Sequence, residues 1–372
     1  INKDKLIESV GSNIPRIDYT DSGCPSLLLE PQRTNASRYS EDFTNAYWIK
    51  EGSSIVSNSI ISPDGTMNAD KLVENTSTGL HRTYSTLITT SQNTDVTITV
   101  FAKKGGRNIF GLQTSSGGQP YVWFNLDNGS IELQQVNIVG KIESLPNGWY
   151  KCSATWNTAS ATSDRVFIQL AKSTSTQSYT GDGTSGIYIW GSQFETGSFP
   201  TSYIKTVAST VTRIGETANS SGNASTFNDS EGVLFAEISA FKGDNTDRQI
   251  SLSNGSNSNR IGFQLLANGT QFQFYVESGG STQLNSFQTI DSTNTNKIGF
   301  SYKVNDFKIY LNGFLIITDT SGLVPIGLSD LAFDRGTGGD IFYGKTKDLR
   351  VYNTALTDLE LETLTSFTSF NA

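Results

Sequence analysis

The chain has 372 residues, of which 17% are charged, and its formal net charge is −8. This length allows two domains with ordinary cores, and the acidic balance argues against nucleic acid and anionic lipid as partners, because both require clustered Lys and Arg. No apolar run approaches the length of a membrane span, so we expect no membrane insertion.

The first 36 residues form the least regular part of the sequence. Pro15, Pro25 and Pro31 interrupt short apolar runs, and prolines at this spacing rule out a continuous helix. We therefore expect residues 1–36 to be an extended N-terminal connector or attachment segment that lies on the following domain or on another subunit.

Residues 37–206 predict one strand after another. Their alternating runs are bounded by Asn-Gly and Asp-Gly pairs, which tolerate positive φ and are typical of antiparallel sheets. In the last run, Ile187 and Ile189 alternate with Tyr188 and Trp190, so we expect a central strand that is apolar on both faces. The expected strands cover residues 45–50, 70–74, 96–103, 108–113, 122–126, 150–155, 165–171 and 187–194, and they indicate a jelly roll.

Residues 207–228 are rich in Ser, Thr and Asn, which indicates a linker. A second domain is expected at residues 229–372, with a hairpin turn at Asn312-Gly313 and one short helix at residues 358–366 capped by Thr357. Its expected strands are residues 232–241, 249–254, 260–266, 271–276, 297–303, 306–311, 314–319, 329–332 and 347–352. The chain is thus predicted to be all-β, with two tandem β-sandwiches.

The second domain contains the segments GVLFAEI (232–238), KIYLNGFLI (308–316) and YGKTKDLRVYNTALTDLELETL (343–364). With them it resembles the concanavalin A-like, laminin-G-type sandwiches. The first domain and its approach contain, in this order, CPSLLLEPQRTN, RYSEDFTNAYW, SPDGTMNADKL, NGWYKCSATW and IYIWGSQFETGSFPTSYI. These segments are similar to a module common in tailed-phage virion proteins, which itself resembles carbohydrate-binding jelly rolls.

These resemblances imply a non-enzymatic bacteriophage virion subunit, such as a head fibre, tail fibre or spike, that adheres to host cell-surface glycan. They also imply a homo-oligomer, with a trimer favoured, an N-terminal segment bound to other virion proteins, and assembly in the host cytoplasm. Two alternatives stay open. One is a purely structural capsid decoration protein, and the other is the carbohydrate-binding accessory region of a secreted polysaccharide-degrading enzyme.

The residues themselves give little support to catalysis. His81 is the only histidine, and no nucleophile motif lies near it. Glycoside hydrolysis requires two carboxylates that face the sugar, and the sequence contains no E-x-D-x-x-E run of the kind found in concanavalin-like glycosidases. We therefore expect a protein that is not an enzyme.

A sugar site combines an exposed aromatic ring with nearby polar groups. Val122 and Phe124 share one strand parity, and Tyr121 and Trp123 share the other. If the first pair faces the core, the second pair faces outward. The expected carbohydrate site consists of Tyr121, Trp123, Arg107, Gln113 and Gln119. The alternative is that Trp123 packs under a loop or against a neighbouring subunit.

Hard cations bind where several oxygens converge from loops. Asp334, Asp340 and Asp348 lie around glycine-rich turns, which makes them candidate ligands of a structural Ca²⁺. Turn chemistry accounts for the same residues without an ion, and Lys345 and Lys347 stand where the resembled family often has an acidic residue. We expect no cofactor, with a structural Ca²⁺ at these three aspartates as the alternative.

Overall fold

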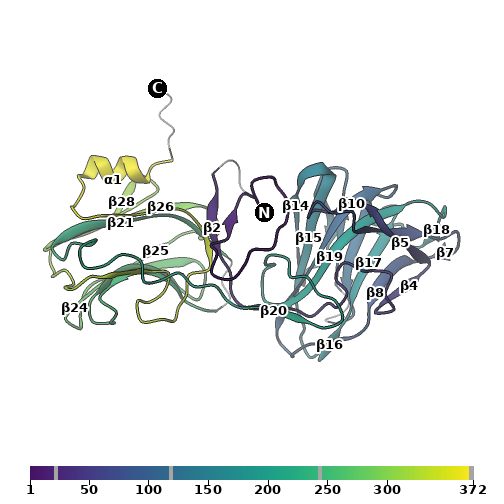
Figure 1. The fold of residues 1–372 in the computed structure, drawn as a ribbon, viewed down its shortest axis with the longest axis horizontal. Coiled ribbons are helices and arrows are strands. Elements are labelled where there is room, and N and C mark those ends of the chain that lie inside the picture. Colours follow the sequence, from purple (N-terminus) through teal and green to yellow (C-terminus); the bar gives the residue numbers. More distant parts are fainter. Residues whose placement is uncertain (21–23, 117–119, 242–244, 368–372) are drawn as a thin grey trace, which may run out of the picture. The chain divides into compact units, whose positions relative to one another are not determined.

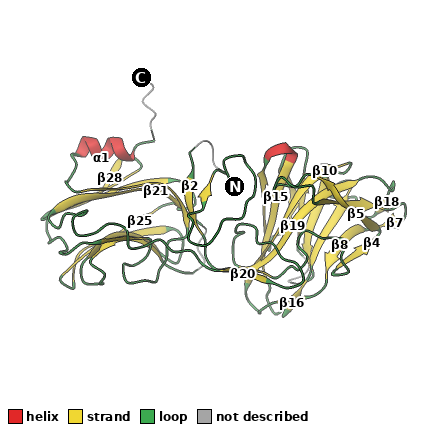
Figure 2. Cartoon of the chain, viewed as in Figure 1, coloured by secondary structure: helices red, strands yellow, loops and turns green. Residues whose placement is uncertain are grey.

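The computed structural model describes residues 1–20, 24–116, 120–241 and 245–367 (Figure 1). They form two compact units, one of Ile1–Ser9 and Gln32–Ile214 and the other of Val10–Pro31 and Gly215–Ala372. Each unit is a β-sandwich of two antiparallel sheets (Figure 2), so the predicted all-β fold with tandem sandwiches is confirmed. No helix among the described residues is long and apolar enough to cross a membrane.

The first unit contains two six-stranded sheets, and successive strands of the chain often alternate between them. One sheet has, in spatial order, β14 (Ile138–Ser144), β15 (Trp149–Asn157), β10 (Asp95–Gly105), β19 (Gly186–Thr196), β6 (Ala69–Glu74) and β5 (Ser53–Ile60). The other has β13 (Ser130–Gln134), β12 (Tyr121–Asn125), β11 (Ile109–Thr114), β17 (Val166–Ala171), β8 (His81–Ser85) and β4 (Trp48–Glu51). The strand β19 lies between β10 and β6, as expected for the central strand that contains Ile187 and Trp190.

Three short strand pairs complete the first unit. They are β16 (Ser163–Asp164) with β9 (Ile88–Thr89), β18 (Tyr179–Thr180) with β7 (Thr78–Gly79), and β20 (Val211–Arg213) with β3 (Arg33–Asn35). A 3₁₀ turn at Pro146–Gly148 precedes β15. The core lies between the two large sheets, where inward side chains such as Ile98, Phe110 and Ile168 are fully buried.

The second unit packs a seven-stranded sheet against a five-stranded one. The larger sheet has β1 (Ile17–Asp18), β2 (Ser26–Leu29), β30 (Gly344–Tyr352), β21 (Glu231–Ala240), β26 (Asn296–Lys303), β27 (Asp306–Leu311) and β28 (Phe314–Asp319). The smaller has β25 (Ser281–Thr289), β24 (Gln271–Ser278), β23 (Arg260–Leu265), β22 (Arg248–Ser253) and β29 (Asp330–Ala332). Its core is rich in phenylalanine, including Phe263, Phe274 and Phe300.

The N-terminal segment divides between the two units. Strand β2 pairs with β30, which places Leu28 opposite Lys345. Asp18 forms an ion pair of 2.8 Å with Lys345, and Arg16 forms one of 2.8 Å with Glu30. The structure therefore differs from the expected connector of residues 1–36, because residues 10–31 complete a sheet of the second unit. Within the expected linker of residues 207–228, strand β20 pairs with β3.

Two predictions that rest on local residue chemistry, the hairpin turn at Asn312-Gly313 and the helix cap at Thr357, are confirmed. Asn312 and Gly313 both have positive φ in the turn between β27 and β28. The helix α1 (Asp358–Thr365) begins after Thr357, whose hydroxyl accepts a hydrogen bond from the Glu360 amide while the Glu360 carboxylate accepts one from the Thr357 amide. This reciprocal pair is a capping box. Of the strands with five or more residues, those outside the expected ranges are β5, β8, β13, β14 and β25.

Candidate functional site

The sheet formed by β13, β12, β11, β17, β8 and β4 presents one face to the core and one face away from it. Along each strand, alternate side chains point to opposite faces, and Phe110, Phe124 and Ile168 take the inward positions. Directly opposite residues of antiparallel strands share a face. Two rows therefore cross the face away from the core, here called the outer face: Trp123, Gly111, Gln169, Arg82 and Glu51 in one, and Tyr121, Gln113, Phe167, Tyr84 and Ile49 in the other.

A stacked aromatic pair stands at the centre of the outer face. The rings of Tyr84 and Phe167 lie 4.9 Å apart with an interplanar angle of 29°, and both side chains are half-buried. The Arg82 guanidinium lies 4.8 Å from the Phe167 ring centroid, and the Arg165 guanidinium lies 5.4 Å from that of Tyr84. Arg82 also forms an ion pair of 2.8 Å with Glu51. Flat apolar rings and charged hydrogen-bond donors thus share one surface.

Trp123 occupies the expected strand parity but does not face solvent. Its side chain is only 2% exposed, so the prediction of an outward, accessible indole is wrong. The reason is the neighbouring Gly111, because a Cβ atom there would lie 2.9 Å from the indole ring. With Ile109 and Ala171 alongside, the small residue leaves a hollow in the sheet surface that the ring fills. The indole N–H has no hydrogen-bond partner among the described residues.

The other expected sugar-binding residues do not all lie on the outer face. Tyr121 and Gln113 lie opposite each other on β12 and β11, are half-buried, and belong to the outer face. Gln119 falls outside the described residues. Arg107 does not join the others, because its guanidinium forms two hydrogen bonds of 2.7 and 2.6 Å with the Glu74 carboxylate. The structure therefore brings together Tyr121, Gln113 and the buried Trp123, and assigns Arg107 to another network.

That network joins several polar groups at the edge of the sandwich. The Glu74 side chain is fully buried and accepts a further hydrogen bond of 2.8 Å from the Tyr179 hydroxyl. Burial opposes ionisation of Glu74, but the bonds from Arg107 and Tyr179 outweigh it and lower the pKa of Glu74. The His81 ring nitrogens lie 2.6 and 3.0 Å from the carbonyl oxygens of Gly52 and Tyr179. These contacts hold loops together, and His81 has no access to solvent.

The candidate metal ligands do not converge. Among the described residues, no three His, Cys, Asp or Glu side chains are placed to share an ion. Asp340 pairs with Arg335, and Asp348 pairs with Arg350. Asp334 is buried and accepts a hydrogen bond from the backbone N–H of Gly336. Each carboxylate thus has a partner of its own, and a shared Ca²⁺ site at these residues does not fit the structure.

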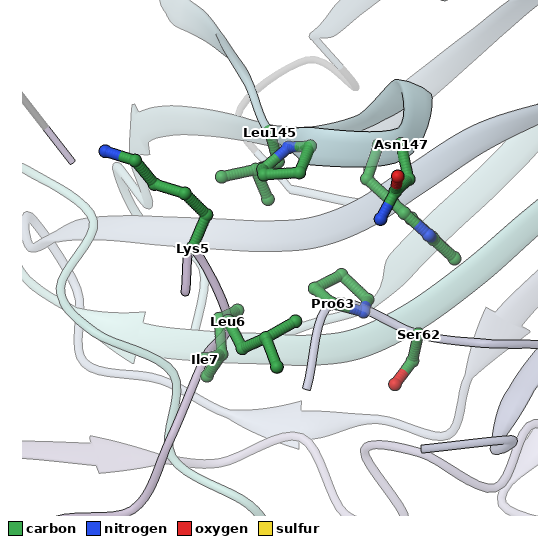
Figure 3. Close-up of a pocket in the computed structure, with 9 residues that line it drawn as sticks. Lys5, Leu6, Ile7, Ser62, Pro63, Leu145 and Asn147 are labelled. Carbon is green, nitrogen blue, oxygen red and sulfur yellow. The ribbon is translucent and has the colours of Figure 1, made fainter. Parts of the chain in front are cut away.

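A small pocket lies at the other sheet of the first unit, where residues 5–7 meet the loops that precede β6 and β15 (Figure 3). Leu6, Pro63 and Leu145 supply apolar walls. The backbone N–H of Ile7 donates a hydrogen bond of 2.9 Å to the Pro63 carbonyl. Its polar lining residues are Lys5, Ser62 and Asn147, and part of its wall is formed by residues 5–7 themselves.

The outer face combines aromatic rings with charged and amide groups. Of the carboxylates at this face, Glu51 forms an ion pair with Arg82 and Glu132 accepts a hydrogen bond of 2.7 Å from Asn125. Half-buried rings and amides suit the apolar face and polar rim of a pyranose. Sequence analysis missed Tyr84, Arg82 and Phe167. Phe167 could have been found, because Val166 and Ile168 mark its parity as outward.

Comparison with known proteins bears on the second unit. Residues 236–362 match the concanavalin A-like lectin/glucanases superfamily. The second sandwich is thus similar in sequence to concanavalin A-like domains. No curated protein sequence matches the chain.

Several solved structures match part of the chain. One is the CBM40 of the Ruminococcus gnavus IT-sialidase, at 16% identity and a TM-score of 0.33, covering 40% of this chain and 94% of that one. Another is a heptameric SAP-like pentraxin from Limulus polyphemus, at 16% identity and a TM-score of 0.32, covering 41% and 77%. A third is domain 4 of the Geobacillus stearothermophilus arabinanase AbnA, at 13% and 0.33, covering 45% and 82%.

Proposed function

We propose that the chain is a non-enzymatic glycan-binding protein, and that it acts as a bacteriophage head-fibre, tail-fibre or spike subunit that adheres to host cell-surface polysaccharide. The observation that carries the binding role is the Tyr84–Phe167 pair between two arginines on an open sheet face. The concanavalin A-like domain in the second unit supports the same class of ligand.

The outer face is suited to an extended chain of sugars. The row that contains Phe167 runs across several strands with partly exposed side chains, and neighbouring strands are about 4.8 Å apart, so this row offers contacts to successive rings. Tyr121 and Gln113 continue the row that contains Phe167, and the amide of Gln113 can both donate and accept hydrogen bonds. Sugar hydroxyls need this mixture of donors and acceptors around an apolar ring face.

The placement on a virion rests on the sequence resemblance of the first domain and its N-terminal approach to tailed-phage virion modules. A face that binds one glycan weakly gains avidity when many copies are displayed together. We therefore propose a homo-oligomer, with a trimer as the first expectation, and attachment to other virion proteins through the N-terminal segment. Light scattering of the purified chain measures the oligomeric state directly.

A glycan array probed with the full chain tests the binding role. Tyr84→Ala and Phe167→Ala should each lower the affinity for bound polysaccharide at least tenfold, because each removes a ring from the proposed platform. The matched control is Tyr188→Ala. Tyr188 is also half-buried, and its ring also contacts a cation, because Lys71 Nζ lies 5.6 Å from the ring centroid. It belongs to the other sheet of the same unit. Equal losses in all three variants would contradict the assignment.

Labelling of intact virions with an antibody to the chain separates the alternatives. Label on the particle together with loss of host adsorption in the Tyr84 variant supports the adhesion role. Label on the particle with no glycan binding would favour a capsid decoration protein. Secretion of the chain together with a catalytic domain would favour the accessory region of a polysaccharide-degrading enzyme.

A further inference from the structure

The smaller sheet of the second unit also has a face directed away from its core. Inward positions are taken by Ile250, Phe263 and Phe274, and the residues of opposite parity form three rows on the far side. The rows are Gln249, Gln264, Gln273 and Phe287; Ser251, Gly262, Tyr275 and Asn285; and Ser253, Arg260, Glu277 and Thr282. This surface, here called the β22–β25 face, combines amides, one guanidinium, the carboxylate of Glu277, the exposed ring of Phe287 and the buried ring of Tyr275.

Arg260 is the unusual residue of the β22–β25 face. Its guanidinium carbon lies 4.7 Å from the centroid of the Tyr275 ring, which is itself only 3% exposed. Among the described residues Arg260 has no acidic partner, and its Nε is buried without an acceptor. Glu277 stands directly opposite on β24, but its carboxylate accepts a hydrogen bond of 2.9 Å from Thr282 instead. A half-buried guanidinium is thus left with unused donors.

The aspartate of this network, Asp340, is already paired with other residues. Gln249 connects it to Tyr275: the Gln249 Oε1 accepts a hydrogen bond of 3.1 Å from the Tyr275 hydroxyl, and the Gln249 Nε2 donates one of 3.0 Å to Asp340. Asp340 in turn is neutralised by Arg335, whose Nε lies 2.8 Å from the carboxylate. The contact from Arg260 to Gln249 is long, at 3.5 Å. The network therefore orients the guanidinium without neutralising it.

An exposed aromatic ring lies on the same face. Phe287 on β25 is 50% exposed and stands opposite Gln273. Strand β25 is two strand spacings, or about 10 Å, from β23, which bears Arg260. Phe287 stands opposite Gln273 and Arg260 opposite Glu277, four residues or about 13 Å further along β24. The two residues are therefore about 16 Å apart, a span for an oligosaccharide of about three rings. The residues between them are the neutral Gln273, Asn285 and Tyr275, and Gln273 donates a hydrogen bond of 2.7 Å to Asn285.

We propose that the β22–β25 face is a second saccharide site, selective for an acidic sugar whose carboxylate is bound by Arg260 while another ring of the same oligosaccharide stacks on Phe287. A guanidinium presents paired N–H donors that match the two oxygens of a carboxylate. A half-buried cation also gains most from an anionic partner, because its own hydration is reduced. A neutral sugar has no group that meets this requirement.

The experiment uses the full chain and a panel of immobilised uronate-containing and sialylated polysaccharides, each paired with its carboxyl-reduced, neutral form. The chain carries Tyr84→Ala and Phe167→Ala throughout, so that the outer face of the first unit does not contribute. In this background, acidic polymers should bind and their reduced forms should bind at least tenfold more weakly. Inorganic sulfate and phosphate, added as competitors, show whether the site takes any anion or a carboxylate in particular.

Two substitutions test the proposed contacts of Arg260 and Phe287 separately. Arg260→Gln should lower affinity for the acidic polymer at least tenfold, and Phe287→Ala several-fold. The matched control is Arg350→Gln, an exposed arginine of the same unit whose loss changes the net charge equally, and it should leave binding unchanged. If Arg260→Gln disturbs folding, the exposed Phe287 still tests the site. Equal binding by Arg260→Gln and the parent, equal binding of the reduced polymers, or no binding to any acidic polymer would overturn the proposal.

Discussion

The substitution Asp164→Asn tests what holds a buried charge inside the first sandwich. Asp164 is fully buried at the end of β16. Its carboxylate oxygens accept hydrogen bonds from Thr114 Oγ1, from N and Oγ of both Ser115 and Ser116, from Trp156 Nε1 and from Arg165 N. These donors replace the water that a carboxylate loses on burial.

Asparagine keeps one acceptor oxygen and places an N–H₂ group where the second oxygen was. The hydroxyls of Thr114 and Ser116 can rotate to accept from it, but the indole N–H of Trp156, 3.1 Å from Oδ2, can only donate. Hydrogen bonds to a charged group contribute about 1.5–3 kcal/mol each. Losing the one from Trp156 lowers the free energy of unfolding by about 1.5–3 kcal/mol, an appreciable part of a typical domain's stability.

Tryptophan fluorescence measures this loss in the first unit, because all five tryptophans, Trp48, Trp123, Trp149, Trp156 and Trp190, lie within residues 32–214. The assay is urea unfolding of the full chain followed by their emission. The matched control is Asp127→Asn, which removes an exposed ion pair with Lys104 and should cost less than about 1 kcal/mol. A shift of the unfolding midpoint no larger for Asp164→Asn than for this control would refute the reasoning.

Two further predictions concern acid stability and the indole on the outer face. Burial opposes ionisation of Asp18, but hydrogen bonds from Lys345 and Thr20 outweigh it and lower the pKa of Asp18 from 3.8 to about 2. The stability this gives the second unit is present above about pH 4 and is lost as the pH falls toward 2, about 2 kcal/mol in all. Asp18→Asn should remove that loss in circular-dichroism unfolding curves, and an unchanged pH profile would contradict the assignment. Gly111→Val should lift the Trp123 ring, shift its emission to the red and cost about 1–3 kcal/mol, whereas unchanged emission would show that the ring is not held by Gly111.

The sequence allowed the buried strands to be predicted better than the exposed ones. Runs such as residues 96–103 and 297–303 are apolar at alternate positions because one face of each packs into a core, and that pattern is readable without a structure. The turn at Asn312-Gly313 and the cap at Thr357 depend only on local chemistry. Strand β25, STQLNSFQT, resembles a loop in composition, because most of its side chains are exposed. It exists because its backbone pairs with β24.

The residues of the candidate site were also only partly predictable from the sequence. Alternation gave the correct parity for Tyr121 and Trp123, but accessibility depended on Gly111 of the neighbouring strand, and a single sequence does not reveal which strands are neighbours. Tyr84 was missed because β8 mixes His, Arg, Thr and Ser and gives no strand signal of its own. Arg107 was assigned to the sugar site because it is close in sequence to Gln113 and Tyr121. Its actual partner, Glu74, lies on β6, more than thirty residues earlier in the chain.

The second sandwich is assembled from two separate stretches of the chain. Strands β1 and β2 come from residues 10–31, and the rest comes from residue 215 onward. A single protease cut near residue 214 would therefore not release this sandwich intact, because the N-terminal piece still supplies two of its strands. A recombinant fragment that starts at residue 215 would leave the edge of β30 without its partner, and an unpaired edge of this kind invites aggregation.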